Sequence, residues 1–537
     1  IGSSFQWPQY PTAQAADRLV NRRMVVVASI GNSGANGLYS AGAPGLGKKV
    51  IGVASFDNSH VLLRTFDVTP AGLTIGYTNA TAAPPAPTSG SLPLGKTGTP
   101  ASAADACTVA GALPDLTGQA VLIRRGTCGF YEKSRRAQLA GAAAVVLYNN
   151  AAGRFNPTVA VATGADGLPV TIPVVAVSDT EGVAINNAID AGPQSLNWTA
   201  NLGSFPSATG GLISSFSSYG LSPDLTLKPD IGAPGGQIYS TYPLEAGGFA
   251  TISGTSMASP HVAGAAALML QAKPRTNSQV MRTILQNSAD PKPWWGNPAL
   301  GFLDNVHRQG AGMLDIDDAI LATTKIEPGK IATGESEAGP YTETLHIENN
   351  GDTDVTYDLS HVAALATGPN TFAPAFFNAP ATVAFSAPSV SVPAGGSATV
   401  DVTITPNAAL ADLSQYGGYV VFTPQGGGQT YSVPYAGIKG DYQAKQVLVP
   451  TASGFPLVGR ATACVRVIDF ECINGSYTVP VAPATFSMTD AFNVPVLLVH
   501  LDHQSRLFRV EIFDQRGRNW HRSYNENYMP RNSTATG

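Results

Sequence analysis

Two uninterrupted apolar runs near the start of the chain constrain its fold more than any other feature. Met24–Ile30 and Val50–Ser55 show no alternation of apolar and polar residues, which is typical of strands buried on both faces of a parallel sheet. The stretch before the first run places Ala13, Ala16 and Val20 on one face of a predicted helix. A helix, a buried strand, a loop and a second buried strand together predict a doubly wound α/β sheet.

Composition excludes several classes of protein. Charged residues make up 12% of the chain, about half the usual share, and hydrophobic residues make up 44%, enough to build packed cores. The formal net charge of −5 gives no electrostatic support for binding nucleic acid. The longest apolar stretches, such as Ala263–Leu270, are far too short to cross a bilayer. We therefore expect a soluble, turn-rich protein with no membrane span and no nucleic-acid partner.

Changes in composition and in the pattern of predicted elements divide the 537 residues into five segments. The α/β pattern occupies 1–60 and returns in 209–325. Between them, 61–208 begins with a loop rich in Pro, Ala, Thr and Gly and continues with a β-α-β pattern, so we predict an inserted α+β domain. Short strands separated by turn signals predict a β-sandwich over 326–445. The last segment, 446–537, is predicted to be a second β-rich domain that lacks a convincing closing strand, and we expect it to be truncated.

Cysteine usage bears on the compartment. The four cysteines form two close pairs in the sequence, Cys107 with Cys128 and Cys464 with Cys472. This spacing suggests two local disulfides and an oxidising compartment, and neither pair has the C-x-x-C spacing of a zinc or redox site. We therefore expect a secreted, extracellular protein. Four N-x-S/T sequons, candidate glycosylation sites, agree with that compartment: Asn79, Asn197, Asn474 and Asn532.

The stretch SGTSMASPHVAG at 253–264 carries the strongest functional signal. Ser256 is predicted to lie where a glycine-flanked turn enters a helix, and Pro260 fits the first helical turn, where its missing N–H has no partner. Such a helix directs backbone N–H groups and its positive end toward charge developing beside Ser256. The hydroxyl is then a nucleophile if a base is available. The alternative is that Ser256 serves only as a helix N-cap.

The whole twelve-residue stretch resembles the nucleophile motif of the subtilisin-like serine proteases, the subtilases. This resemblance implies that Ser256 attacks peptide carbonyls. In subtilases the segment after a buried strand carries the oxyanion-hole asparagine, and the stretch SIGNSG at 29–34 assigns that role to Asn32; a plain Asn-Ser-Gly turn is the alternative. The resemblance also implies a set of substrate-binding residues: Ile1, Gly2, Ser29, Ile30 and Gly31.

The catalytic Asp and His that this resemblance demands are not recognisable in the chain. Both should precede Asn32, yet the residues before it hold one acid, Asp17, and no histidine. Asp230 lies in a stretch that resembles a structural turn of the family, so we assign it no catalytic role. No signal peptide is visible at Ile1. We therefore expect a fragment that lacks the catalytic Asp and His, has a bare sheet edge, and is nearly inert alone.

Two further regions resemble domains that accompany some subtilases. The region 121–149 resembles the protease-associated (PA) domain of lactocepin-like and cucumisin-like enzymes, and the β-rich region after 325 resembles their fibronectin-type-III-like domains. The resemblance thus implies a secreted serine endopeptidase with polypeptide substrates. We expect no cofactor; subtilases often bind calcium, but the chain has no Asp-rich loop, so we assign no metal site. The rival interpretation is a non-catalytic binding protein built on a decayed protease scaffold.

Overall fold

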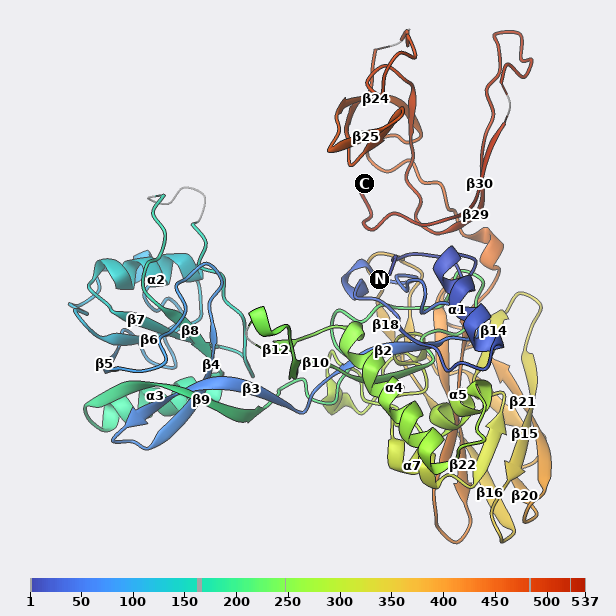
Figure 1. Cartoon of the computed structure of the whole chain (residues 1–537), viewed down its shortest axis with the longest axis horizontal. Helices are drawn as coiled ribbons and strands as arrows, with labels where there is room; N and C mark the ends of the chain where they lie inside the picture. The colour runs from blue at the N-terminus through green and yellow to red at the C-terminus, as the bar shows by residue number, and fades with distance from the viewer. Residues whose placement is uncertain (1, 162–166, 247, 482–483, 522, 537) are drawn as a thin grey trace. The chain divides into compact units, whose positions relative to one another are not determined.

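The chain forms two compact units (Figure 1). The computed structural model describes residues 2–161, 167–246, 248–481, 484–521 and 523–536. The first unit comprises Ile1–Asp57, Gly211–Gly236 and Ser253–Gly537, and the second comprises Asn58–Gly210 and Gln237–Ile252.

The first unit contains a three-stranded parallel sheet in the order β1 (Val27–Ser29), β2 (Ile51–Asp57) and β10 (Ile231–Gly236). The two apolar runs are therefore neighbours in a parallel sheet, as predicted. The first run was predicted to be a strand throughout, but only its last part pairs, and Met24 is 52% exposed. Among the described residues β1 pairs with β2 alone. It is thus an edge strand of the described sheet.

Helices pack against this sheet and supply the apolar core. Helix α1 (Pro11–Asn21) buries Ala13, Ala16 and Val20, the three residues predicted to share a face. Helix α4 (Thr255–Ala272) packs on all three strands (Figure 1). Shorter helical segments complete this part: the 3₁₀ turn η1 (Gly34–Asn36), α5 (Ser278–Asn287), the 3₁₀ turn η4 (Pro298–Leu300), α6 (Val306–Gln309) and α7 (Ile316–Leu321).

A β-sandwich follows; the sequence predicted one over 326–445, and the strands of its two sheets lie between Thr324 and Ile438. Leu345, Val402 and Phe422 are among the residues that fill its core. One sheet has the order β13 (Thr324–Glu327), β15 (Tyr341–Asn349), β21 (Ser397–Thr405) and β19 (Thr382–Phe385). The other has the order β14 (Ile331–Glu335), β23 (Tyr431–Ile438), β22 (Gln415–Pro424), β16 (Val355–Ala363) and β20 (Ser389–Val392), with the short β17 (Ala366–Thr367) and β18 (Phe376–Phe377) at its side.

The C-terminal part of the first unit consists of small sheets and hairpins. The sequence showed no convincing strand near its end, but the structure has one, β30 (Tyr524–Met529), which pairs with β29 (Ser505–Val510). A tight hairpin joins β25 (Arg466–Ile468) to β26 (Glu471–Ile473). The remaining elements are the 3₁₀ turn η5 (Tyr442–Ala444), β24 (Leu457–Ala463), β27 (Ser476–Thr478) and β28 (Val496–Leu498).

The second unit is built on a closed barrel. Its strands follow the order β3 (His60–Thr69), β4 (Leu73–Asn79), β8 (Val174–Val177), β7 (Ala144–Tyr148), β6 (Ala120–Arg124), β5 (Ser91–Lys96) and β9 (Gln194–Pro206). The other elements are the 3₁₀ turns η2 (Thr108–Ala110) and η3 (Leu244–Ala246), α2 (Phe130–Leu139), α3 (Asp179–Ala191), and the hairpin of β11 (Ile238–Thr241) and β12 (Phe249–Ile252).

The bounds of the second unit differ from the predicted insert, 61–208. The hairpin of β11 and β12 groups with this unit, although its sequence position placed it in the returning α/β segment; β11 contacts β3 of the barrel. Helix α2 ends at Leu139 with Ala140 as its C-cap, and Gly141, the next residue, has the positive φ of 94° that favours glycine after a helix.

No helix among the described residues is long and apolar enough to cross a membrane.

Candidate active site

Ser256 lies at the N-terminus of α4. The helix begins at Thr255 with Gly254 as its N-cap, and Ser256 is its second residue. Because Gly254 holds the capping position, Ser256 is not the N-cap, and that alternative is wrong. The Ser256 side chain is exposed. The first turn of an 18-residue helix provides a positive dipole end at this point.

The position of Pro260 differs from the prediction. It is the sixth residue of α4 rather than a residue of the first turn. A proline here has no N–H to donate to the carbonyl four residues earlier, and that carbonyl belongs to Ser256. The first turn of the helix is therefore less tightly closed around Ser256 than an uninterrupted turn.

Asn32 is held by the residue that precedes the serine. Its Oδ1 accepts hydrogen bonds from the Thr255 main-chain N–H at 2.9 Å and from the Thr255 hydroxyl at 2.8 Å. The Thr255 hydroxyl in turn accepts from the Gly31 N–H at 3.2 Å. Since Oδ1 is occupied, the Nδ2 group of Asn32 is the free end of the amide. Sequence reasoning missed this role of Thr255, although its place in the motif, directly before the serine, was the available signal.

Two N–H donors lie close to the same point beside Gly254. A Cβ placed on Gly254 would lie 3.4 Å from Asn32 Nδ2, 3.6 Å from the Ser256 main-chain N and 3.6 Å from the Met257 Sδ. Within the described part of the chain neither nitrogen has a hydrogen-bond acceptor. Two unpaired donors that approach one point can both bind the oxygen of a reacting carbonyl, as the donors of an oxyanion hole do.

A cavity of about 260 Å³ adjoins these donors. The cavity brings together the predicted nucleophile, the predicted oxyanion donor and the predicted substrate-binding residues, except Ile1, which lies outside the described residues. Ser3 pairs with Ala43 through two main-chain hydrogen bonds, which fix the start of the chain along one wall. The residues that line the cavity are Gly2, Ser3, Ser4, Ser29, Ile30, Gly31, Asn32, Ser33, Gly42, Ala43, Thr255 and Ser256.

Ser218 positions the loop that carries Asn32. Its hydroxyl accepts from the Ser33 N–H at 2.9 Å, and its own N–H donates to the Gly31 carbonyl at 3.0 Å. Gly31 has a positive φ of 119°, and a Cβ there would lie 2.8 Å from the Ser218 Oγ. A side chain at position 31 would therefore clash with Ser218 and displace the loop that carries Asn32. No local pattern indicated Ser218, which lies 185 residues from Ser33 in the chain.

No general base accompanies Ser256 in the described residues. The cavity wall contains no His, Asp or Glu. His261 lies on the same helix, where its Nδ1 is 3.0 Å from the Met257 carbonyl. Asp17 accepts hydrogen bonds from the main-chain N–H groups of Lys48 and Lys49 and so holds a loop.

Asp230 is a structural residue. Its side chain is fully buried and pairs with Lys228 at 2.5 Å and with Lys330 at 2.6 Å. It also accepts from the Gly52 N–H at 2.8 Å. Burial raises the pKa of this carboxyl, but the two lysines outweigh burial and hold the pKa well below its usual range. The assignment of Asp230 to a structural turn agrees with these contacts.

Both predicted disulfides are present, Cys107–Cys128 and Cys464–Cys472. Glycosylation of the sequons stays a prediction. Asn79 and Asn532 accept main-chain hydrogen bonds through Oδ1, from Ala86 and Leu501 respectively; Asn197 donates to the Thr69 hydroxyl, and Asn474 has a positive φ of 50°.

Glu335, Glu337 and Asp441 form an acidic group in the first unit, with carboxylate oxygens within 4.8 Å of one another. Glu335 already accepts from the Tyr442 N–H at 2.6 Å. Exposed or half-exposed carboxylates of this kind do not by themselves define a cation site, so we assign none.

Comparison with known proteins agrees with this geometry. Residues 2–312 match the model of the subtilase family, and residues 333–436 match an Fn3-like domain. The chain belongs to the subtilase family of serine peptidases, and its β-sandwich is an Fn3-like domain.

The chain is similar to three curated relatives over part of their length. It is 31% identical to the minor extracellular protease Vpr of Bacillus subtilis, over 67% of this chain and 43% of Vpr. It is 29% identical to the PI-type proteinase of Lactococcus lactis, over 63% of this chain and 19% of that proteinase. It is 26% identical to the C5a peptidase of Streptococcus pyogenes, over 61% of this chain and 28% of that peptidase. The chain thus spans less than half the length of these relatives.

Proposed function

We propose that this chain is the nucleophile-bearing part of a secreted serine endopeptidase that cleaves polypeptides through an acyl-enzyme on Ser256. The observation that carries the proposal is the approach of two unpaired donors, Asn32 Nδ2 and the Ser256 N–H, to one point beside Gly254, at 3.4 and 3.6 Å. A mere serine turn has no need for two unpaired donors that converge on one point. The disulfides and the likeness to an extracellular protease support secretion.

Each residue of the cavity has its own part in the proposed reaction. A substrate strand enters the cavity along Gly2 and Ser29–Gly31 and places its scissile carbonyl over Ser256. The Ser256 Oγ attacks the carbonyl carbon while a base takes the hydroxyl proton. The carbonyl oxygen, now negative, accepts hydrogen bonds from Asn32 Nδ2 and the Ser256 N–H. The proton then passes to the leaving amine nitrogen, and water later releases the acyl group from Ser256.

The base and its orienting acid come from a polypeptide segment other than the described residues. Two adjoining surfaces in the first unit support this. Helix α4 exposes two large apolar side chains on either side of its buried Met269, Leu268 at 49% and Leu270 at 38%, and β1, which α4 contacts, has one free edge in the described part of the sheet. A segment that pairs with β1 and covers α4 would bury both surfaces and approach Ser256 at the end of the same helix.

The remaining parts of the chain serve substrate access and interaction. We propose that the barrel of the second unit is a PA domain, on the strength of the stretch 121–149, and that the Fn3-like domain supports the catalytic part. Lys330, from the turn between β13 and β14, completes the charge cluster around Asp230 and thereby ties that sandwich to the parallel sheet.

An acylation experiment tests the proposal on this chain alone. A p-nitrophenyl ester of an N-blocked peptide has a leaving group that needs no proton, and added imidazole can replace the absent base. Oxyanion-hole donors and binding alone give residual catalysis of about 10³–10⁴-fold over water in triad enzymes. We expect intact-mass analysis to show one acyl group on Ser256, formed faster with imidazole.

Ser256→Ala is the matched control and should remain unlabelled. Acylation that persists in Ser256→Ala, or that is spread over several surface residues, would contradict the proposal. A chain that binds the peptide but is never acylated would instead support the rival interpretation, a non-catalytic binding protein.

A further inference from the structure

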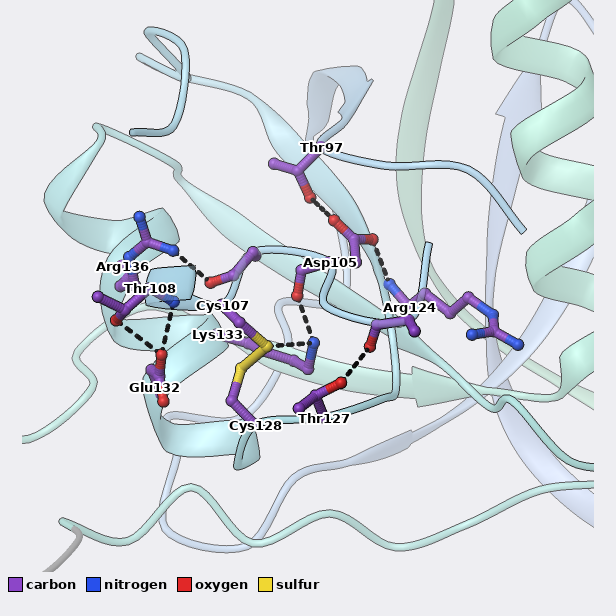
Figure 2. Close-up of a disulfide and its surroundings, with 12 residues drawn as sticks. Thr97, Asp105, Cys107, Thr108, Arg124, Thr127, Cys128, Glu132, Lys133 and Arg136 are labelled. Carbon is purple, nitrogen blue, oxygen red and sulfur yellow. Dashed lines mark hydrogen bonds between the residues drawn. A yellow bond between two sulfur atoms is a disulfide. The ribbon is translucent and has the colours of Figure 1, made fainter. Parts of the chain in front are cut away.

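The Cys107–Cys128 disulfide of the second unit lies against a buried lysine (Figure 2). Lys133, on the first turn of α2, is fully buried. Its Nζ donates to the Asp105 main-chain carbonyl and lies 3.5 Å from the Cys107 Sγ. An ammonium group thus touches one of the two sulfur atoms from inside the protein.

This ammonium has no carboxylate partner among the described residues. The Asp105 carboxylate accepts instead from the Thr97 hydroxyl and from the Arg124 main-chain N–H, both at 2.7 Å (Figure 2). The Glu132 carboxylate, on the same helix as Lys133, accepts from the Thr108 N–H and hydroxyl, both at 2.7 Å.

The neighbouring guanidinium groups are likewise directed elsewhere. Arg136 donates to the main-chain carbonyls of Ala106 and Gly111, and the Arg124 guanidinium donates to that of Ser102. The Nζ of Lys133 therefore faces a carbonyl oxygen and an uncharged sulfur. Burial lowers the pKa of this ammonium, against the opposing charges of Asp105 and Glu132. A thiolate at Cys107 would give it the anionic partner that it lacks.

The two sulfur-bearing residues differ in access. Cys107 is 1% exposed, whereas Cys128 is half-buried and lies between the exposed residues Thr127 and Gly129. An external thiolate therefore reaches the Cys128 side of the bond first. In thiol–disulfide exchange the rate rises as the leaving thiol becomes more acidic, and an adjacent lysine makes a thiol more acidic.

We propose that Cys107–Cys128 is a thiol–disulfide exchange site, at which an external dithiol attacks Cys128 and Cys107 leaves beside the Lys133 ammonium. The entering thiolate sulfur bonds to Cys128 Sγ as the Cys107–Cys128 bond breaks, and Cys107 Sγ keeps the bonding electron pair. The second thiol of the reagent then attacks the mixed disulfide. The reagent becomes a cyclic disulfide, Cys128 leaves as a thiolate and takes a proton, and the protein has gained two electrons.

The reduced form should keep its fold, because other contacts hold the same segments together. Glu132 binds Thr108, and Arg136 binds the carbonyls of Ala106 and Gly111. These contacts join α2 to the loop that carries Cys107 without the disulfide. Exchange is therefore reversible: the two sulfurs stay close, and an oxidised dithiol restores the bond.

The Cys464–Cys472 disulfide is an internal control. It closes the exposed hairpin of β25 and β26, and both cysteines are half-buried. The Cys472 sulfur lies 3.4 Å from the Ala463 carbonyl oxygen. With no cation against either sulfur among the described residues, this bond should follow ordinary disulfide behaviour.

The first test compares the two disulfides in the full chain. The protein is equilibrated with graded ratios of reduced to oxidised dithiothreitol, free thiols are alkylated, and each pair is quantified by mass spectrometry. At pH 8.5, Lys133→Met should make Cys107–Cys128 at least about fivefold harder to reduce, the factor expected at that pH when a thiol pKa rises by one unit to the ordinary 8.5. Lys96→Met, which removes a lysine paired with Asp190 in the same unit, should change neither equilibrium. If the equilibrium constant for reduction of Cys107–Cys128 is unchanged in Lys133→Met, the proposal is overturned.

The second test uses protein with Lys133 intact, so it stands even if Lys133→Met does not fold. Glutathione, a monothiol, should form its mixed disulfide on Cys128 rather than Cys107. In Cys128→Ser, the Cys107 thiol should have a pKa at least about one unit below the ordinary 8.5, measured by the pH dependence of iodoacetamide alkylation. A mixed disulfide on Cys107, or a Cys107 pKa of 8.5 or higher, would refute the proposal.

Discussion

Asp230 and Ser256 lie in the same compact unit, but their surroundings are opposite. Asp230 is fully buried, and two lysines and a main-chain N–H saturate its carboxylate. Ser256 is exposed, and its hydroxyl has no hydrogen-bond partner in the described residues. The carboxylate that looks most like a triad acid therefore stabilises the fold, and the serine is left free to react. Here the partners of a group, more than its residue type, decide its role.

The largest effect that this comparison predicts is on stability. Asp230→Ala leaves the fully buried Lys228 and the neighbouring Lys330 without their counter-charge. Removal of one partner from a buried ion pair costs about 3–5 kcal/mol. We expect the free energy of unfolding of the first unit to fall by that amount, measured by urea titration with hydrogen exchange of peptides from β2.

Asp412→Ala is the matched control for that experiment. Asp412 pairs with Lys439 at 2.7 Å, but its side chain is 70% exposed, and exposed pairs contribute about 0–1 kcal/mol. If both variants lose the same small free energy of unfolding, the Asp230 cluster does not stabilise the first unit in the way that its burial indicates.

The next effect concerns the rate of acylation. Asn32→Ala removes the free Nδ2 donor, and loss of such a donor in a subtilisin lowers the rate about 10²–10³-fold, equivalent to about 2.7–4 kcal/mol. Thr255→Val should cost less, about fivefold, because the Thr255 N–H still holds Asn32 Oδ1. The measurement is the rate of imidazole-assisted acylation of Ser256 by the peptide ester.

Asn36→Ala provides the control on the same loop. Asn36 donates to the Ser533 carbonyl and does not line the cavity. An equal loss of rate in Asn36→Ala and Asn32→Ala would mean that loop order, rather than the Asn32 amide, explains the effect.

Particular residues show how far the sequence predicts this molecule. The apolar face of α1 and the pairing of the two apolar runs in a parallel sheet follow from local pattern, and the structure matches them. The motif around Ser256 indicated the candidate nucleophile, the segment after β1 indicated Asn32, and the structure places both residues at one cavity. Both signals are local in sequence.

What the sequence did not predict depends on tertiary neighbours. Met24 lies before β1, outside the paired part of the first apolar run, and is exposed. Lys330 lies 100 residues from Asp230, and Ser218 lies 185 residues from Ser33. Contacts over such separations are set by packing, and no pattern within one segment encodes them.

Acid should weaken the first unit through its buried histidines. Burial lowers the pKa of His307 and of His503 to about 3, below the ordinary 6.5. Between pH 6.5 and 3 the unfolded chain therefore binds more protons than the folded chain, and the free energy of unfolding falls as the pH falls. From pH 6.5 to 5 each histidine accounts for about 2 kcal/mol.

His503→Phe tests this assignment. The ring of residue 503 packs against Tyr39 and Tyr442 at centroid distances of 4.2 and 5.4 Å, so phenylalanine keeps the packing and removes the titration. We expect the loss of stability between pH 6.5 and 5 to shrink by about 2 kcal/mol. The same pH slope in the variant and the wild type would show that His503 is not a neutral, buried group.

The smallest expected effect on stability is that of Ser256→Ala, the counterpart of Asp230→Ala in this comparison. Ser256→Ala removes a hydroxyl that has no partner in the described residues, from an exposed position on a helix in which alanine is the most favourable residue. The free energy of unfolding should change by less than about 0.5 kcal/mol, while acylation at residue 256 is abolished. A variant that instead loses several kcal/mol would place Ser256, like Asp230, among the residues that hold the fold together. Its hydroxyl would then be a structural group, and the convergence of the Asn32 and Ser256 donors beside Gly254 would need another explanation.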